Sequence, residues 1–216
     1  RETVASTGAE LPAPQPVVSS RDHKPSLSDL FGPIYLRRTL TVWVIWFAAY
    51  FINYGFVIWL PTLYRTVFKL PLDVSLKYNM ITQAVGLLGT LICALSIDYV
   101  GRRTWFALAF GLGGISIAML FMTPGATSEQ VLIFMSIAYF FISTINIGVY
   151  LYTPELYPTR SRALGVGTAT AWLRFASIIG PSIVGHMLGG EMMSVYLLFA
   201  ATAICAAVVT GLFAVE

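Results

Sequence analysis

Long stretches without any charged side chain are the feature that most restricts how this chain can fold. No Asp, Glu, Lys or Arg occurs, for example, between Arg38 and Arg65 or between Arg103 and Glu129. About 20 apolar residues in a helix cross the hydrocarbon of a bilayer, and lipid offers the backbone no water to bond. The sequence therefore predicts an all-α membrane protein with six transmembrane helices, at residues 39–60, 78–97, 104–123, 131–153, 163–188 and 192–215.

The composition excludes most soluble classes of protein. Charged residues make up 11% of the chain and the mean hydropathy is +0.76, whereas soluble domains carry about 25% charged residues. The net charge of +3 does not indicate nucleic acid, because the basic residues lie in small groups between apolar stretches. Cys93 and Cys205 lie within apolar stretches, so we expect them to pack as small apolar side chains and expect no metal or cofactor. No catalytic grouping of side chains occurs, which predicts that the chain is no enzyme.

The first 33 residues are rich in Pro, Ser, Ala and charge, a composition that cannot bury a core. We expect residues 1–33 to be a flexible cytoplasmic linker and residues 34–216 to be the six-helix bundle. A linker usually follows another domain, so we expect a missing N-terminal part. Basic residues are concentrated at one set of helix ends rather than the other: Arg37, Arg38, Arg102, Arg103, Arg160 and Arg162 against Arg65, Lys69 and Lys77. The positive-inside rule then places both termini in the cytoplasm, at the plasma or inner cell membrane.

Polar side chains form stripes at helical spacing on four of the six predicted helices. The stripes include Trp46, Tyr50 and Asn53 on the first helix, Gln83 on the second, and Asn146 and Tyr150 on the fourth. One explanation is that these groups bond between helices and only stabilise packing. The other is that four helices line a shared aqueous cavity, while the third and sixth, which hold no charge, Asn or Gln in their interiors, face lipid.

Arg174 is the one charged side chain inside the fifth predicted helix. A charge at that depth costs about 2.5–3.5 kcal/mol on insertion scales and needs water, an anion or an acid as partner. Its planar guanidinium suits a carboxylate ligand, although a carbonyl or an acid in the missing half would also satisfy it. Pro181 removes one backbone hydrogen bond from this helix, so Gly180 and Pro181 are the predicted hinge.

Two loops at the same predicted membrane face carry acids and bases. The first has the sequence Asp98-Tyr99-Val100-Gly101-Arg102-Arg103, and the second has Pro154-Glu155-Leu156-Tyr157-Pro158-Thr159-Arg160-Ser161-Arg162 followed by Gly165. Ordinary topogenic charge would explain either loop alone. Taken together, the two loops predict a conformational gate whose ion pairs break and form, with these members: Asp98, Gly101, Arg102, Arg103, Glu155 and Arg162.

These loops resemble two elements of the major facilitator superfamily. The first resembles D-x-x-G-R-R, and the second resembles the P-E-x-x-P-T-x-x-R-x-x-G element of its sugar-porter-like branches. The second loop looks most like that of the metabolite–proton symporter and synaptic-vesicle-glycoprotein-like branches. The chain departs from the pattern at Ala94, where Gly is frequent, and at Tyr99, where a base is usual.

The resemblance implies helices 7–12 of a twelve-helix carrier that works by a rocker-switch cycle, with its solute held between two six-helix halves. It also implies that the first, second, fourth and fifth helices of each half line the cavity, which are the four that carry the stripes.

The predicted function is a secondary active transporter of a small organic anion, an aromatic or heterocyclic carboxylate. Arg174 supports the anion, the neighbouring aromatic residues support the ring, and coupling to protons is implied by the resemblance alone. The predicted substrate-binding set is Trp46, Tyr50, Asn53, Gln83, Asn146, Tyr150 and Arg174. The alternatives are a sugar or polyol carrier and a non-transporting membrane interaction protein built on a carrier fold. Expected partners are the solute, the proton, the lipid bilayer and the missing N-terminal half, with no nucleic acid.

Overall fold

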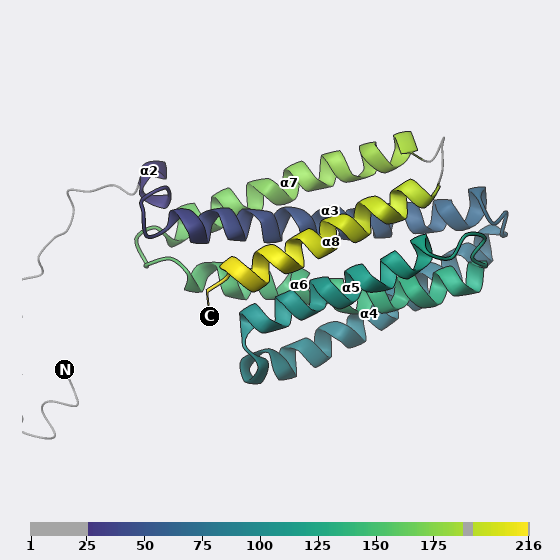
Figure 1. The fold of residues 1–216 in the computed structure, drawn as a ribbon, viewed down its shortest axis with the longest axis horizontal. Helices are drawn as coiled ribbons and strands as arrows, with labels where there is room; N and C mark the ends of the chain where they lie inside the picture. The colour runs from purple at the N-terminus through teal and green to yellow at the C-terminus, as the bar shows by residue number, and fades with distance from the viewer. Residues whose placement is uncertain (1–25, 188–191, 216) are drawn as a thin grey trace, which may run out of the picture.

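The computed structural model describes residues 26–187 and 192–215, and every regular element in these ranges is a helix. A short helix, α2 (Leu27–Leu30), precedes six long ones: α3 (Leu36–Thr66), α4 (Leu72–Val100), α5 (Arg102–Phe121), α6 (Ser128–Glu155), α7 (Arg162–Met187) and α8 (Met192–Phe213). The six long helices lie alongside one another in a bundle (Figure 1). Each is long and apolar enough to cross a membrane, so the predicted all-α fold with six transmembrane helices is confirmed.

Most of the helices extend beyond the apolar spans predicted from sequence. α3 runs from Leu36 to Thr66 where 39–60 was expected, and α4 from Leu72 to Val100 where 78–97 was expected. The prediction counted apolar residues, whereas a helix can continue into the headgroup region, where charged side chains meet water. Pro61 and Pro154 lie inside α3 and α6, each near the C-terminal end of its helix. Residue 188, the predicted end of the fifth span, lies outside the described residues.

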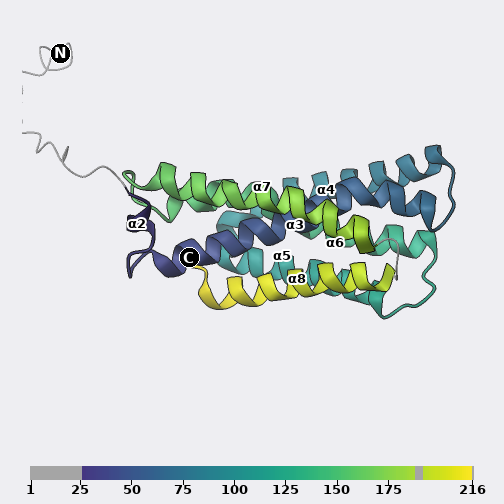
Figure 2. The ribbon, with the colours of Figure 1, turned by 90° about the horizontal axis from the view of Figure 1, so that it is seen from above.

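α3 is the central helix of the bundle, because it packs against α4, α6, α7 and α8. The most extensive helix pairs are α5 with α8, α3 with α7, and α4 with α6. Figure 2 shows α8 ending at the same end of the bundle as α2. Large side chains with no exposed surface fill the space between helices, among them Trp46, Tyr64, Phe106 and Phe110.

Close packing of α4 on α6 depends on glycine. A Cβ atom at Gly89 would overlap the carbonyl oxygen of Phe140, and one at Gly86 would lie 2.5 Å from the Tyr139 ring. The absence of side chains lets the two backbones approach, as small residues do in many membrane helix pairs. Ser143 then donates its hydroxyl hydrogen to the carbonyl oxygen of Gly86 at 2.8 Å. This contact connects the two helices that flank the cavity described below.

Two arginines satisfy the last carbonyl groups of α8. Arg37 Nη2 donates to the carbonyl oxygen of Leu212 at 2.8 Å, and Arg103 donates through Nε and Nη2 to that of Gly211. The C-terminal carbonyls of a helix lack partners within the helix and carry a partial negative charge, which a cation stabilises. Sequence analysis placed Arg103 in the gate, but the structure bonds its side chain to the end of α8.

Residues 26–33, which were assigned to the linker 1–33, pack against the bundle. Ser26 and Asp29 form a capping box at the start of α2, and Leu30 is 1% exposed. The Tyr157 hydroxyl donates to Thr39 Oγ1 at 3.0 Å, and Thr39 donates to the carbonyl oxygen of Leu30 at 3.0 Å. Burial raises the pKa of Tyr157, so its hydroxyl keeps the proton that it donates. Residues 1–25 lie outside the described part of the chain.

Replacing Gly89 with Ala should destabilise the bundle, because the added methyl group overlaps the Phe140 carbonyl oxygen. Overpacking of this kind costs about 1–3 kcal/mol. The measurement is the thermal unfolding midpoint of the detergent-purified protein, followed by fluorescence-detected size exclusion. Gly167→Ala is the matched control, because a Cβ there has no neighbour within 4 Å. Equal midpoints for the two variants would contradict the proposed packing.

Candidate functional site

A cavity of about 370 Å³ lies between α3, α4 and α6. Its lining combines amides, phenols and small side chains: Tyr50, Asn53, Gln83, Gly86, Leu87, Thr90, Tyr139, Ser143, Asn146, Ile147 and Tyr150. The structure thus brings together five members of the predicted substrate-binding set, namely Tyr50, Asn53, Gln83, Asn146 and Tyr150. Three of the four helices with polar stripes contribute to this cavity.

Two amide groups in the lining are not satisfied by the protein. The Oδ1 atoms of Asn53 and Asn146 are buried, and neither has a hydrogen-bond partner among the described residues. Tyr50, by contrast, has a partner: it donates its hydroxyl hydrogen to the backbone carbonyl oxygen of Asn146 at 3.0 Å. Most buried polar atoms in folded proteins have a partner. Two unpaired amide oxygens beside one cavity therefore indicate a place where a bound molecule or water completes the hydrogen bonding.

Trp46 lies behind the cavity lining and supports it. The side chain has no exposed surface, and its Nε1 donates to Thr153 Oγ1 on α6 at 2.8 Å. Its ring stacks on Tyr50 with centroids 5.6 Å apart and meets Tyr150 edge-on at 4.7 Å. Sequence analysis grouped Trp46 with the substrate-binding residues, and the structure places it where it orients two aromatic side chains that line the cavity.

Several lining residues were absent from the predicted set. Tyr139 and Ser143 on α6 and Thr90 on α4 belong to the polar stripes of those helices, and they line the cavity. Asn79 belongs to the α4 stripe as well, but it is not part of the lining. On α4 and α6, residues at helical spacing thus share the face that lines the cavity, and the depth of a residue along that face decides whether it belongs to the lining.

Arg174 lies on the exposed side of α7 and does not line the cavity. Its helix buries the opposite face, which consists of Gly165, Ala169, Leu173, Ala176, Gly180 and Val184. Across the described residues, no hydrogen bond or ion pair is made by the Arg174 guanidinium. The helix is continuous through the predicted hinge at Gly180 and Pro181, and Gly180 packs close to the carbonyl oxygen of Phe51.

An ion-pair cluster joins the loop between α4 and α5 to the loop between α6 and α7. It lies at the end of the bundle that carries Arg37, Arg102 and Arg162, called the basic end below. Arg102 Nε lies 2.7 Å from Glu155 Oε2, and Arg102 Nη2 donates to Glu155 Oε1 at 2.8 Å. One charge-assisted hydrogen bond, from Nη2, therefore joins the two side chains within this ion pair. Asp98 Oδ1 lies 3.5 Å from the same Nη2. Gly101 supplies the turn before α5 with a φ of 87°, a value that favours glycine.

The remaining two members of the predicted gate lie apart from this cluster. Arg103 bonds the end of α8, as described above. Arg162 begins α7, and its exposed side chain makes no ion pair or hydrogen bond within residues 26–187 and 192–215. The structure therefore brings together Asp98, Arg102 and Glu155, with Gly101 shaping the turn.

Comparison with known proteins decides the family. A family model described as Major Facilitator Superfamily matches residues 3–181. The chain belongs to the major facilitator superfamily. Synaptic vesicle 2-related protein of Xenopus laevis is 30% identical over 97% of this chain and 41% of its own length. Niacin transporter NiaP of Acinetobacter baylyi is 32% identical over 76% of this chain and 36% of its own length.

This major facilitator chain spans about two fifths of the length of these relatives. The family assignment confirms the resemblance seen in the two loops, and it confirms a transporter fold in place of an enzyme. The six described membrane helices match the number in one half of a major facilitator carrier.

Replacing Thr153 with Val should destabilise the aromatic support of the cavity, because it leaves the buried Trp46 Nε1 without an acceptor. The expected loss is about 1–2 kcal/mol, measured as a lower midpoint in a titration with sodium dodecyl sulfate. Thr168→Val is the matched control, since it removes a longer indole–threonine bond of 3.4 Å from the partly buried Trp43. A loss at Thr168 equal to that at Thr153 would contradict this role of Trp46.

Proposed function

We propose that this protein is a secondary active carrier for a small organic anion, an aromatic or heterocyclic carboxylate. In this proposal the six helices are the second half of a twelve-helix carrier, and alternating access exposes a midplane site to each side in turn. The observation that carries the proposal is the cavity between α3, α4 and α6, which combines an aromatic wall with unpaired amides. Niacin, the solute in the name of one relative, is a heterocyclic carboxylate of this kind.

The aromatic wall suits a flat ring. Tyr50 and Tyr150 line the cavity and both contact the buried Trp46. Aromatic rings prefer offset-stacked or edge-to-face contacts, which contribute about 0.5–1.5 kcal/mol beyond the burial of area. The amides of Asn53 and Asn146 would then pair with polar atoms on the edge of the ring, which explains why the protein leaves them unsatisfied.

Arg174 is the proposed partner of the carboxylate. It lies within a membrane-spanning helix, where an unpaired charge is expensive, and the described residues give it no acid. It does not line the cavity of this half, so the proposal is that the anion meets Arg174 where α7 faces the other half. The proton is the proposed coupling ion, with its acceptor in that other half. The bundle end with Arg37, Arg102 and Arg162 is the proposed cytoplasmic face.

A neutral sugar or polyol is the second candidate, and the same cavity favours it for a different reason. The amides of Asn53, Gln83 and Asn146 and the neighbouring phenols can all bond hydroxyl groups. A polyol makes no use of Arg174. The role of this one side chain therefore separates the two candidates.

Substitution of Arg174 should weaken the binding of pyridine-3-carboxylate. Arg174→Lys keeps the charge and loses the bidentate fork, so we expect the dissociation constant to rise by about 10-fold or more, as loss of about 1.5–3 kcal/mol implies. Arg174→Ala should bind still more weakly, and pyridine-3-carboxamide should compete poorly with the native carrier. The measurement is equilibrium binding of labelled ligand to the protein in nanodiscs.

The control is Arg65→Ala, which removes an exposed arginine from the last turn of α3, outside the cavity. It should bind the anion as the parent does. Full anion affinity in a folded Arg174→Ala variant would overturn the proposed anion site. Binding of a polyol that is unaffected by Arg174→Ala, without any anion binding by the parent, would establish the second candidate.

We propose that Arg102 keeps the basic end of the carrier closed through its ion pair with Glu155. Its removal should therefore favour the conformation in which this end is open. Arg102→Gln removes the ion pair with Glu155, which is partly exposed and worth about 0.5–1 kcal/mol, so the open population should rise by about two- to fivefold. Alkylation of a cysteine introduced at Ser161 measures the opening. Arg162→Gln is the matched control and should change the rate little, because Arg162 pairs with nothing in the described structure. A larger effect at Arg162 than at Arg102 would contradict this role of Arg102.

A further inference from the structure

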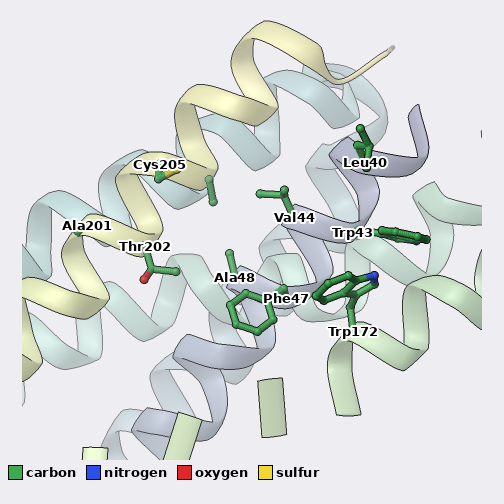
Figure 3. Close-up of a pocket in the computed structure, with 10 residues that line it drawn as sticks. Leu40, Trp43, Val44, Phe47, Ala48, Trp172, Ala201, Thr202 and Cys205 are labelled. Atoms are coloured by element: carbon green, nitrogen blue, oxygen red, sulfur yellow. The ribbon is translucent and has the colours of Figure 1, made fainter. Parts of the chain in front are cut away.

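A second hollow of the described structure has no part in the proposed solute site. It is a groove of about 720 Å³ whose floor is α3 and whose walls are α7 and α8, and its lining is Leu40, Trp43, Val44, Phe47, Ala48, Trp172, Ala201, Thr202, Cys205 and Ala206. Figure 3 shows Trp43, Phe47 and Trp172 on one side, with Thr202 and Cys205 of α8 opposite. The groove and the cavity share no lining residue.

The groove offers an occupant almost no hydrogen bonding. Thr202 donates its hydroxyl hydrogen to the carbonyl oxygen of Leu198 on its own helix at 2.8 Å. Trp43 Nε1 donates to Thr168 Oγ1 at 3.4 Å. The other lining side chains are apolar, apart from the indole of Trp172 and the thiol of Cys205. Because its walls are helices long and apolar enough to cross a membrane, an apolar chain is the occupant that matches the chemistry of the groove.

A cation stands where the groove meets the basic end of the bundle. Arg37 lies one helical turn before Leu40, on the same face of α3. It uses Nη2 for the carbonyl oxygen of Leu212, and its guanidinium lies 5.3 Å from the centre of the Phe213 ring. The residue is nevertheless exposed, and a guanidinium has five N–H donors. Arg37 can therefore bind an anionic group without giving up its bond to α8.

The spacing between this cation and the far end of the groove matches one leaflet of a bilayer. From Arg37 to Ala48 the helix rises about 17 Å, and half of a hydrocarbon core of about 30 Å is roughly 15 Å. At one edge of the groove, the exposed Phe31 packs edge-on against the lining residue Trp43, with ring centroids 5.6 Å apart. A molecule with its charge at Arg37 can thus lay an apolar tail along the groove without leaving its leaflet.

We propose that the α3–α7–α8 groove binds one acyl chain of an anionic phospholipid, whose phosphate group is held by Arg37. The site is independent of the solute cavity, so a failure of either proposal leaves the other unaffected. Bound lipid would fill the space between α7, which carries Arg174, and α8. These two helices have little direct contact with each other, so the acyl chain would replace the packing that they lack.

Tryptophan quenching tests the position of the acyl chain. The protein is placed in nanodiscs that contain phosphatidylglycerol or phosphatidylcholine with dibrominated acyl chains, because bromine quenches a tryptophan that it contacts. Brominated phosphatidylglycerol should quench the parent more strongly than Trp172→Phe, whose indole in the groove is missing. It should also quench more strongly than brominated phosphatidylcholine at equal mole fraction, with about a fivefold preference, since one basic residue near an anionic surface contributes roughly 1 kcal/mol.

Two variants with matched controls test the binding of the lipid headgroup and of the acyl chain separately. Arg37→Gln should abolish the preference for phosphatidylglycerol, whereas Arg65→Gln, at the other end of α3, should retain it. Ala201→Phe should fill the groove and remove the quenching that depends on Trp172, whereas Leu197→Phe, exposed on α8 outside the lining, should not. Arg37→Gln also removes a hydrogen bond to α8 and could disturb the fold. The Ala201→Phe variant keeps that bond, so it tests the position of the acyl chain independently.

Cys205 provides a second readout within the native sequence. It is an exposed free thiol in the groove, whereas Cys93 is buried. Phosphatidylglycerol added to delipidated protein should slow alkylation of Cys205, measured by peptide mass spectrometry. Equal quenching in the parent and Trp172→Phe, or no preference between the two lipids, would overturn the proposal. Protection of Cys205 that depends on protein concentration and not on lipid would overturn it in favour of a second copy of the chain.

Discussion

A polar group inside lipid has no water to bond, and this constraint shapes the bundle from its backbone outward. Helices satisfy the backbone, and many of the remaining polar groups bond partners on neighbouring helices. Two arginines bond the last carbonyls of α8, Trp46 bonds Thr153, and Ser143 bonds Gly86. Among the buried polar atoms without a partner in the described structure, the amide oxygens of Asn53 and Asn146 belong to side chains that line one cavity.

The same constraint separates two kinds of hollow in one bundle. The cavity between α3, α4 and α6 collects amides and phenols, and the groove between α3, α7 and α8 collects aliphatic and aromatic carbon. Different faces of α3 serve both, with Tyr50 and Asn53 toward the cavity and Val44 and Phe47 toward the groove. One helix therefore separates a polar surface from an apolar one within the same bundle.

The helices and the ion-pair cluster could be predicted from sequence because both follow from local patterns. Stretches without charge indicated the spans, and the two loop motifs indicated that Arg102 and Glu155 act together. Spacing along a helix shows which residues share a face, and it cannot show which neighbouring helix that face meets. For this reason Trp46 was predicted to bind the substrate, whereas it packs behind the residues that line the cavity. For the same reason Arg103 was predicted to belong to the gate, whereas it bonds the end of α8. The separation of Arg174 from the cavity depends on how α7 packs on α3, which only the folded bundle reveals.

The hydrogen bonds from Tyr157 to Thr39 and from Thr39 to Leu30 connect three segments of the chain. Tyr157 belongs to the connection between α6 and α7, Thr39 to α3, and Leu30 to α2. The two hydrogen bonds join α2, through α3, to the loop that precedes α7, the helix that carries Arg174. The short helix before the bundle is in this way joined to the start of the helix that carries Arg174, whose side chain is exposed in the described structure.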